Sequence, residues 1–222
     1  MIFGKIEYLN LLPFHLFLKR HLRHSAEKMA WQKRGSVPAA INRAFRARRV
    51  DAAVISSVRS GGCRCTDFGI VAEGEVWSVL LLPGEGAPDA ESDTSNALAE
   101  VLGLQGRVLI GDKALRYRLE NPEAGIDLAQ AWREREGLPF VFARLCATPR
   151  HIGRLERLTT RFFAHPPKIP HRILVKEARK RGIGADALRD YLKKIHYRLG
   201  WREKRALKRF LTLVGNGRQR LS

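Results

Sequence analysis

Several small polar side chains directly follow apolar segments, where strands are expected to end and helices to begin. Asn10 follows the first such segment, and its amide can donate one hydrogen bond and accept another without changing its protonation state. Ser56 and Ser57 follow the apolar run Val50 to Ile55. Because open α/β sheets bind ligands at the carboxyl ends of their strands, these positions predict a polar ligand site.

Four further residues extend this candidate site. Thr94 and Ser95 begin an expected helix, where free backbone N–H groups and the helix dipole attract an anion. Ser78 is the polar position of an otherwise apolar strand, and Asp112 follows another strand end, where it could orient a substrate hydroxyl. Ordinary structural roles stay open for all of these residues, because asparagine, aspartate, serine and threonine also cap helices.

The sequence lacks the signatures of several common catalytic sites. It contains no G-x-S-x-G turn of a serine hydrolase and no G-x-x-x-x-G-K-[ST] phosphate loop. Cys63, Cys65 and Cys146 match no common zinc pattern, and we expect them to be structural thiols in a reducing cytoplasm. His15, on an apolar helix, is expected in the core. No metal and no nucleotide cofactor is indicated.

Hydrophobic periodicity predicts alternating strands and helices around these residues. The first half is expected to contain strands at 1–7, 50–55, 67–72 and 76–82, and helices at 11–21 and 38–48. The second half is expected to contain helices at 94–102 and 127–136 and from Asp112, and strands at 107–110 and 138–146. The chain from Pro149 onward is expected to be entirely helical.

The order of these elements predicts an α/β fold with two lobes. The segment Pro83 to Asp93, rich in glycine, proline and acidic residues, marks a linker or surface loop. We therefore assign residues 1–80 and 147–222 to a discontinuous lobe 1, and residues 81–146 to lobe 2. The chain crosses to lobe 2 and comes back, so the C-terminal helices return to lobe 1.

Positive charge is concentrated in the last third of the chain. The 222 residues include 41 Lys and Arg against 22 Asp and Glu, a net charge of +19. Residues 1–142 hold 19 basic and 17 acidic side chains (+2), so residues 143–222 hold 22 and 5 (+17). This region could bind nucleic acid, but it carries no recognised binding motif. We favour a solvated face that attracts anionic metabolites.

The distribution of apolar residues argues against a membrane protein. No run of about 18 uncharged apolar residues is present, so we expect no membrane insertion. No signal peptide is recognisable, which predicts a soluble cytoplasmic protein. The sequence leaves the oligomeric state open and is compatible with a homodimer.

An ordered set of segments resembles the menaquinone-biosynthesis family of chorismate dehydratases, which act in the futalosine route to vitamin K2. No single segment is decisive, but their order is specific and they span most of the chain. The segments are Gly4 to Asn10 with Leu12-Pro13, Val37-Pro38 with Ile41-Asn42, Asp51 to Ser57, Val76 to Leu80, Ser92 to Ser95, Ile110 to Arg116, Asp127-Leu128 with Trp132, and Gly137 to Ala143.

The resemblance implies a fold like that of type 2 periplasmic binding proteins, with two lobes, two crossover strands and a ligand in the cleft between them. It implies that the dicarboxylate chorismate loses water to give 3-[(1-carboxyvinyl)oxy]benzoate. It also implies that Asn10 is the catalytic residue, which fixes the ring hydroxyl or the enolpyruvyl carboxylate while a substrate carboxylate takes the ring proton. The expected substrate-binding residues are Ser56, Ser57, Ser78, Thr94, Ser95 and Asp112.

Other interpretations remain open. The paralogous dihydroxynaphthoate synthase of the same pathway shares the fold, but its first turn resembles Ser-Pro-Cys-Pro-Asn-Asp, unlike Tyr8 to Pro13 here. A non-catalytic small-anion-binding protein and a basic nucleic-acid-binding protein are the further alternatives. Between Ser95 and Ile110 the chain is shorter than the family pattern, so we expect a shortened lobe 2 with a reshaped cleft.

Overall fold

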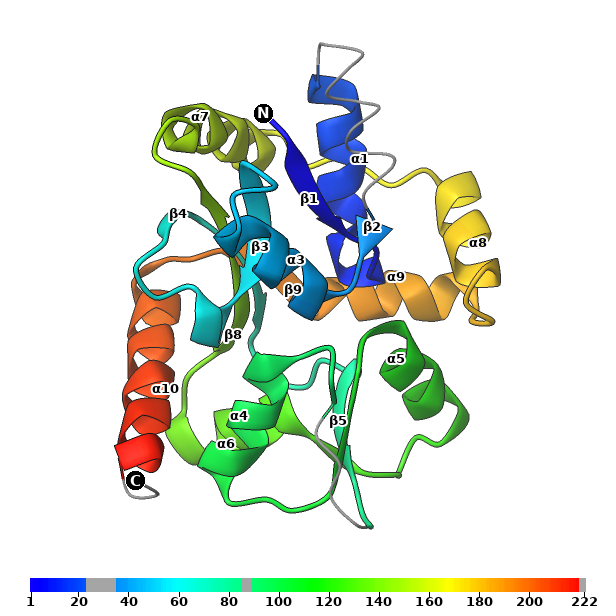
Figure 1. The fold of residues 1–222 in the computed structure, drawn as a ribbon. Helices are drawn as coiled ribbons and strands as arrows, with labels where there is room; N and C mark the ends of the chain where they lie inside the picture. The colour runs from blue at the N-terminus through cyan, green and yellow to red at the C-terminus, as the bar shows by residue number, and fades with distance from the viewer. Residues whose placement is uncertain (23–34, 85–88, 220–222) are drawn as a thin grey trace.

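The strands of the described residues, 1–22, 35–84 and 89–219, form two sheets in this computed structural model, one in each lobe (Figure 1). Only the pairings of β1 with its two neighbours are parallel, and the other described pairings are antiparallel. The large sheet has the order β2 (Gly35–Ser36), β1 (Phe3–Ile6), β3 (Ala52–Ser56), β8 (Phe140–Ala147), β4 (Arg64–Ala72) and β9 (Ile195–Arg198). The small sheet has the order β6 (Arg107–Ile110), β5 (Val79–Leu82) and β7 (Ile126–Asp127).

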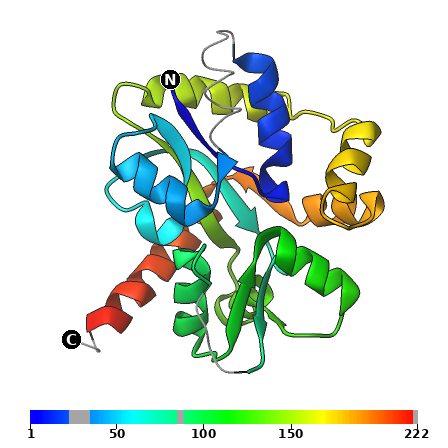
Figure 2. The same cartoon turned by 45° about the vertical axis from the view of Figure 1, so that its right-hand side comes forward.

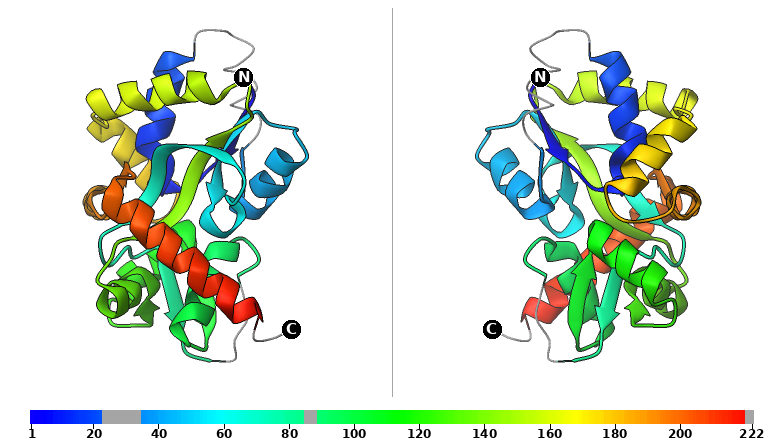
Figure 3. Two further views of the ribbon diagram at one scale, coloured as in Figure 1. Left: turned by 90° about the vertical axis from the view of Figure 1, so that its left-hand side faces the viewer. Right: turned by 90° about the vertical axis from the view of Figure 1, so that its right-hand side faces the viewer.

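Helices cover both faces of the large sheet. In Figure 3, α3 (Pro38–Arg46) lies on one face, and α1 (Leu12–His21) and α7 (Ile152–Ala164) lie on the other. Next to α1 lie α8 (His171–Arg179) and α9 (Ala185–Lys193). Two short 3-10 turns, η1 (Leu9–Leu11) and η2 (Ser57–Arg59), follow β1 and β3. These turns place the expected site residues Asn10 and Ser57 at the end of the sheet that faces the second lobe.

The second lobe packs its helices around the small sheet. Its helices are α4 (Asp93–Leu102), α5 (Gly111–Glu120) and α6 (Leu128–Glu136). The last helix, α10 (Trp201–Gln219), contacts β8 of the large sheet and also α4, so it runs along both lobes (Figure 2). The expectation that the C-terminal helices return to lobe 1 therefore describes α7, α8 and α9, while α10 bridges the lobes.

Asp127 fixes the point where the chain first crosses between the lobes. Its Oδ2 accepts hydrogen bonds from the backbone N–H groups of Val76 (2.9 Å) and Trp77 (2.7 Å), and Trp77 has a left-handed backbone with φ 63°. Its Oδ1 accepts from Ala129 and Gln130 and so caps α6. Burial raises the pKa of the Asp127 carboxyl, and the four backbone donors oppose that rise.

The core of the large lobe is built on aromatic side chains from three elements. The rings of Phe14 in α1 and Phe68 in β4 have centroids 4.4 Å apart, and Phe162 in α7 packs edge-on against Phe14 at 5.5 Å. Phe14 and Phe68 are fully buried. Trp132 of α6 packs edge-on against Phe140 of β8 and Phe210 of α10. Packing of this kind holds the strand ends, and hence the site residues, in fixed positions.

One expectation about the elements needs correction. The segment after Pro149 is not entirely helical, because β9 pairs with β4 at the edge of the large sheet, with Val71 opposite His196. The alternation of Ile195 and Tyr197 with polar residues is a strand pattern, which is easily missed between long helical segments. All of β8 pairs within the large sheet, although most of its residues fall in the segment 81–146 that we assigned to lobe 2. The lobe boundaries at 80/81 and 146/147 stay a prediction.

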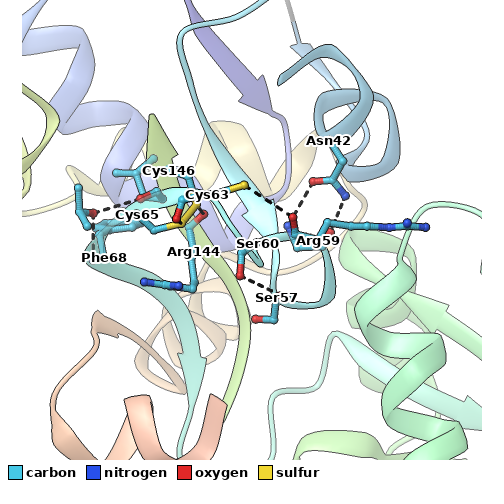
Figure 4. The surroundings of a disulfide bond; sticks show 12 residues. Asn42, Ser57, Arg59, Ser60, Cys63, Cys65, Phe68, Arg144 and Cys146 are labelled. Carbon is cyan, nitrogen blue, oxygen red and sulfur yellow. Dashed lines mark hydrogen bonds between the residues drawn. A yellow bond between two sulfur atoms is a disulfide. The ribbon is translucent and has the colours of Figure 1, made fainter. Parts of the chain in front are cut away.

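The expectation of structural thiols is wrong for two of the three cysteines. Cys65 in β4 and Cys146 in β8 form a disulfide, although they are separated by 81 positions in the sequence (Figure 4). They meet because the antiparallel register of β4 and β8 places these two residues directly opposite each other. Cys63 keeps a free thiol, which donates to the carbonyl oxygen of Arg59 at 3.8 Å.

The described helices include none that is both long enough and apolar enough to cross a bilayer. Residues 85–88, in the middle of the expected loop from Pro83 to Asp93, lie outside the described residues.

Candidate active site

A cavity lies between the two lobes, beyond the ends of β1 and β3. Asn10 and Ser56 line it from the large lobe, and Ser78, Ser92 and Ser95 line it from the opposite side. The rest of its wall is mostly apolar and includes Ile6, Val54, Ile70, Val76, Val79, Ile110 and Phe142. A small number of convergent polar groups in an apolar wall is the usual construction of a small-molecule site.

Asn10 presents an unused hydrogen-bond acceptor at this cavity. Its Oδ1 is buried and has no hydrogen-bond partner among the described residues. Its backbone carbonyl accepts a hydrogen bond of 2.6 Å from the buried hydroxyl of Tyr197, which fixes the turn. The side chain caps neither η1 nor α1. The alternative that Asn10 caps the following helix is therefore wrong, and a buried acceptor without a donor calls for a ligand.

Four serines of the described cavity wall form hydrogen bonds with neighbouring polar groups. The hydroxyl of Ser56 accepts from Nδ2 of Asn42 at 2.8 Å. The hydroxyl of Ser78 accepts from the hydroxyl of Tyr191 at 3.0 Å, and Ser95 bonds to Ser92 through their hydroxyls at 2.9 Å. These contacts fix the position of each hydroxyl at the cavity wall.

Three helices begin at the cavity, which supplies positive potential without a positive side chain. Pro38 is the first residue of α3, Ser92 is the N-cap of α4, and Gly111 is the first residue of α5, and all three line the cavity. No Lys, Arg, Asp or Glu side chain is among the described residues that line it. Helix N-termini and hydroxyls attract an anion through partial charges, so a carboxylate suits the site.

The structure places three of the predicted site residues outside the cavity wall. The hydroxyl of Ser57 donates to the carbonyl oxygen of Val141 at 2.6 Å, and Oγ1 of Thr94 accepts from the backbone N–H of Val58 at 3.4 Å. Ser57 therefore fastens η2 to β8, and Thr94 joins the two lobes.

Asp112 is likewise held by protein groups rather than turned to the cavity. One carboxylate oxygen accepts from the backbone N–H of Leu9 at 3.0 Å, and the other accepts from Nε of Arg181 at 2.5 Å. It caps no helix, because the start of α5 has no side-chain cap. Its role in this structure is to connect α5 to the turn that carries Asn10.

Sequence reasoning missed Tyr8, Ser92, Pro38 and Gly111 as wall residues. Tyr8 donates a hydrogen bond from its hydroxyl to Glu91 in the other lobe. Burial raises the pKa of the Tyr8 hydroxyl, and the Glu91 carboxylate raises it further, so the phenol stays protonated. Pro38 begins a predicted helix and Ser92 stands just before one, and these helix-start signals could have marked both as wall residues.

The lobes are closed on each other in this structure. Besides the Tyr8 to Glu91 bond, Arg59 binds Asp93 across the cleft with two hydrogen bonds of 2.8 and 3.1 Å. The cavity between the lobes is partly open and has a volume of about 60 Å³.

One group of possible metal ligands lies away from the cavity. Ligand atoms of Glu73, His196 and Glu203 come within 4.8 Å of one another. However, Arg133 and Arg202 approach the Glu73 carboxylate at 3.7 and 3.6 Å. Two guanidinium groups beside the same carboxylate repel a further cation, and we interpret the group as an ion-pair network.

Comparisons with known sequences identify the family of this chain. A family model described as menaquinone biosynthesis matches residues 88–216. A chorismate dehydratase of Campylobacter jejuni subsp. jejuni is 41% identical over 215 residues, which cover 95% of this chain and 96% of the relative.

Solved structures resemble the fold at low sequence identity. A protein of Archaeoglobus fulgidus has a TM-score of 0.67 and 14% identity, and the alignment covers 98% of this chain and 97% of that protein. A Candida albicans protein that exhibits the generic periplasmic binding protein fold has a TM-score of 0.57 and 10% identity, over 96% and 89% of the two chains. The likeness shows the two-lobed periplasmic-binding-protein fold that the sequence predicts.

Proposed function

The chain belongs to the menaquinone-biosynthesis family, and from this membership we propose that it is a chorismate dehydratase that works in the cavity between its lobes. The enzyme is then a carbon–oxygen lyase. Chorismate loses its ring hydroxyl and the hydrogen of the neighbouring ring carbon, which leaves 3-[(1-carboxyvinyl)oxy]benzoate and water. The 41% identity to a chorismate dehydratase over nearly the whole chain supports the activity.

The buried, unpartnered Oδ1 of Asn10 is the observation that carries the proposed role of the cavity. An amide oxygen only accepts hydrogen bonds. With both carboxylates ionised, the ring hydroxyl is the single O–H donor that chorismate has. We therefore propose that Oδ1 of Asn10 holds the ring hydroxyl, which favours the first of the two roles predicted from the sequence.

The remaining polar groups of the cavity suit the two carboxylates. Ser56 lies at the end of β3, and Ser92 and Ser95 lie at the start of α4. Hydroxyls and helix N-termini bind a carboxylate without contributing a full charge. No ionised base competes for the ring proton at the described wall of this cavity, so the enolpyruvyl carboxylate of the substrate takes it.

The electron flow needs little from the protein beyond positioning. The electron pair of the broken C–H bond becomes a ring π bond, and the C–O bond pair leaves with the hydroxyl, which takes up the proton as water. Because the ring becomes aromatic, the step is downhill, and the enzyme contributes orientation and donors for the departing oxygen.

Incubation of the purified protein with chorismate tests the proposal. The expected result is a new aromatic absorbance together with the 3-substituted benzoate as product. Asn10→Ala should lower kcat by about 100- to 1,000-fold, because it removes the group that holds the leaving hydroxyl.

Asn96→Ala is the matched control. Outside the cavity, the side-chain amide of Asn96 accepts a hydrogen bond from the backbone N–H of Asp89 and donates one to its carbonyl oxygen. Binding of chorismate without any product would identify a small-anion-binding protein instead. Activity of Asn10→Ala close to that of the unmodified protein would remove the role of Asn10.

A further inference from the structure

We propose that Asn42 and Tyr191, two buried residues that do not line the cavity, turn the hydroxyls of Ser56 and Ser78 into fixed hydrogen-bond donors and so select ionised carboxylates. The identity of the substrate rests on the proposed function, but the selection of the ionised form rests on these contacts. Asn42 and Tyr191 are positioning residues that act through the two serines.

The hydrogen bonds of Asn42 allow only one orientation of its side-chain amide (Figure 4). The backbone N–H of Ser56 donates to Oδ1 of Asn42 at 3.2 Å, and a backbone N–H can only donate. The other end of the amide, Nδ2, must then face Oγ of Ser56, at 2.8 Å, and an amide N–H can only donate as well. The Ser56 oxygen is therefore the acceptor in this pair, and its own proton is left for another partner.

That partner is the ligand. Ser56 and Asn42 are 6% and 5% exposed, so bulk water is not at hand to take the proton. Within the described ranges, no protein group accepts a hydrogen bond from Oγ of Ser56. Since Ser56 lines the cavity, its O–H points to the place where the substrate binds.

Tyr191, in α9, acts on Ser78 in the same way. The hydroxyl of Tyr191, one of the buried residues of α9, bonds to Oγ of Ser78 at 3.0 Å. A phenol is a stronger donor and a weaker acceptor than an aliphatic hydroxyl, so Tyr191 donates. Burial keeps the pKa of the Tyr191 hydroxyl above its usual value, and the proton stays in place. Ser78 is left with its O–H directed to the cavity.

Two fixed donors discriminate between ligands of the same shape in a cavity whose described wall carries no charged side chain. An ionised carboxylate oxygen is acceptor-only and matches an O–H donor. The N–H₂ group of an amide would place a donor against one of these donors. The unmatched pair would lower the affinity by about 10- to 100-fold.

A double-mutant cycle measures whether Asn42 acts through Ser56. Asn42→Asp keeps the shape of the side chain but places an acceptor oxygen where Nδ2 stood. The Ser56 hydroxyl would then donate its proton to this oxygen instead of to the ligand. We expect the KM for chorismate and the Kd for benzoate to rise by about 10- to 100-fold, and the preference for benzoate over benzamide to disappear. In a Ser56→Ala background the same change should have less than about a threefold effect.

Tyr191→Phe provides a second, uncharged variant that preserves packing. It should raise the Kd for benzoate by about 3- to 10-fold, and by much less in a Ser78→Ala background. Asn96→Asp and Tyr117→Phe are the controls, because they alter an amide and a phenol outside the cavity wall. If Asn42→Asp does not fold, Tyr191→Phe decides the question.

Two results would overturn the inference. One is a wild-type protein that binds benzamide as well as benzoate. The other is a loss on Asn42→Asp or Tyr191→Phe that is equally large with and without the partner serine, since that would indicate repulsion or loosened packing. Both are measured with benzoate, so a failure to convert chorismate, which contradicts the proposed function, stays distinguishable from a failure of this inference.

Discussion

Two hollows of the molecule differ in size and in charge. The cavity between the lobes has a volume of about 60 Å³ and no charged side chain in its described wall. The groove between α1 and α8, which we call the basic groove, has a volume of about 460 Å³. Its charged residues are Lys5, Glu7, Lys19, Lys176, Glu177, Lys180 and Arg181.

The charges of the basic groove are largely used within the protein. Lys5 pairs with Glu7 at 2.7 Å, Lys180 pairs with Glu177 at 3.1 Å, and Arg181 pairs with both Glu177 and Asp112. In the cavity, by contrast, neutral groups point inward without a protein partner. The difference supports the proposal that the cavity, where Oδ1 of Asn10 has no partner among the described residues, is the ligand site, and that the basic groove is not.

Among the variants that test this comparison, substitution of Gly111 should reduce activity most, because a side chain at this position would collide with Tyr8 in the cavity wall. Its φ is +69°, and an added Cβ would lie 2.8 Å from Cζ of Tyr8. Gly111→Ala should displace Tyr8 from its contact across the cleft and lower kcat/KM for chorismate by at least about 10-fold. Steady-state kinetics would measure this.

Gly103→Ala separates the steric effect from backbone strain. Gly103 has φ +70°, but nothing lies within 4 Å of an added Cβ. Both variants should lose roughly 1–2 kcal/mol of stability through the left-handed backbone, while only Gly111→Ala loses activity. Equal activity losses in the two variants would show that the tight contact with Tyr8 is unimportant.

His15 in the basic groove should affect stability rather than catalysis. Burial lowers the pKa of the His15 imidazole to about 3, and the charges of Lys5 and Arg181 contribute to the lowering. The unfolded chain takes up this proton below about pH 6.5, whereas the folded protein resists it. The contribution of His15 to stability is therefore fully present above pH 6.5, and it is lost as the pH falls toward 3.

Urea unfolding at several pH values measures this effect. Between pH 6 and 4, the free energy of unfolding should fall by up to about 1.4 kcal/mol per pH unit because of His15. His15→Gln should reduce that slope, while the exposed His165→Gln should leave it unchanged. A slope that is the same in all three proteins would contradict the assignment.

The smallest effect is expected for the exposed lysines of the basic groove. Lys19 and Lys176 line the groove but lie outside the cavity wall. The double variant Lys19→Gln, Lys176→Gln should keep kcat/KM for chorismate within about twofold at 0.15 M salt, where distant charges are screened. A drop of 10-fold or more would assign the basic groove a part in substrate capture and remove the contrast between the two hollows.

Local patterns in the sequence were sufficient for most of the order of elements, though not for β9, and for the family. Val50 to Ile55 is a continuous apolar run and corresponds to β3, and Asp127 before an apolar stretch caps α6. Such features depend on neighbouring residues, which the sequence displays directly. The polar positions at strand ends, including Asn10 and Ser56, were visible for the same reason.

Only the tertiary structure decided which of these polar groups face the cavity. Ser56 and Ser57 are adjacent in the sequence, yet Ser56 lines the cavity and Ser57 binds the carbonyl of Val141 in β8. Asp112 likewise serves Leu9 and Arg181, and Cys65 meets Cys146 through the register of β4 and β8. These outcomes depend on partners about 70 to 100 positions away, whose approach is set by packing of the whole fold and not by any local pattern.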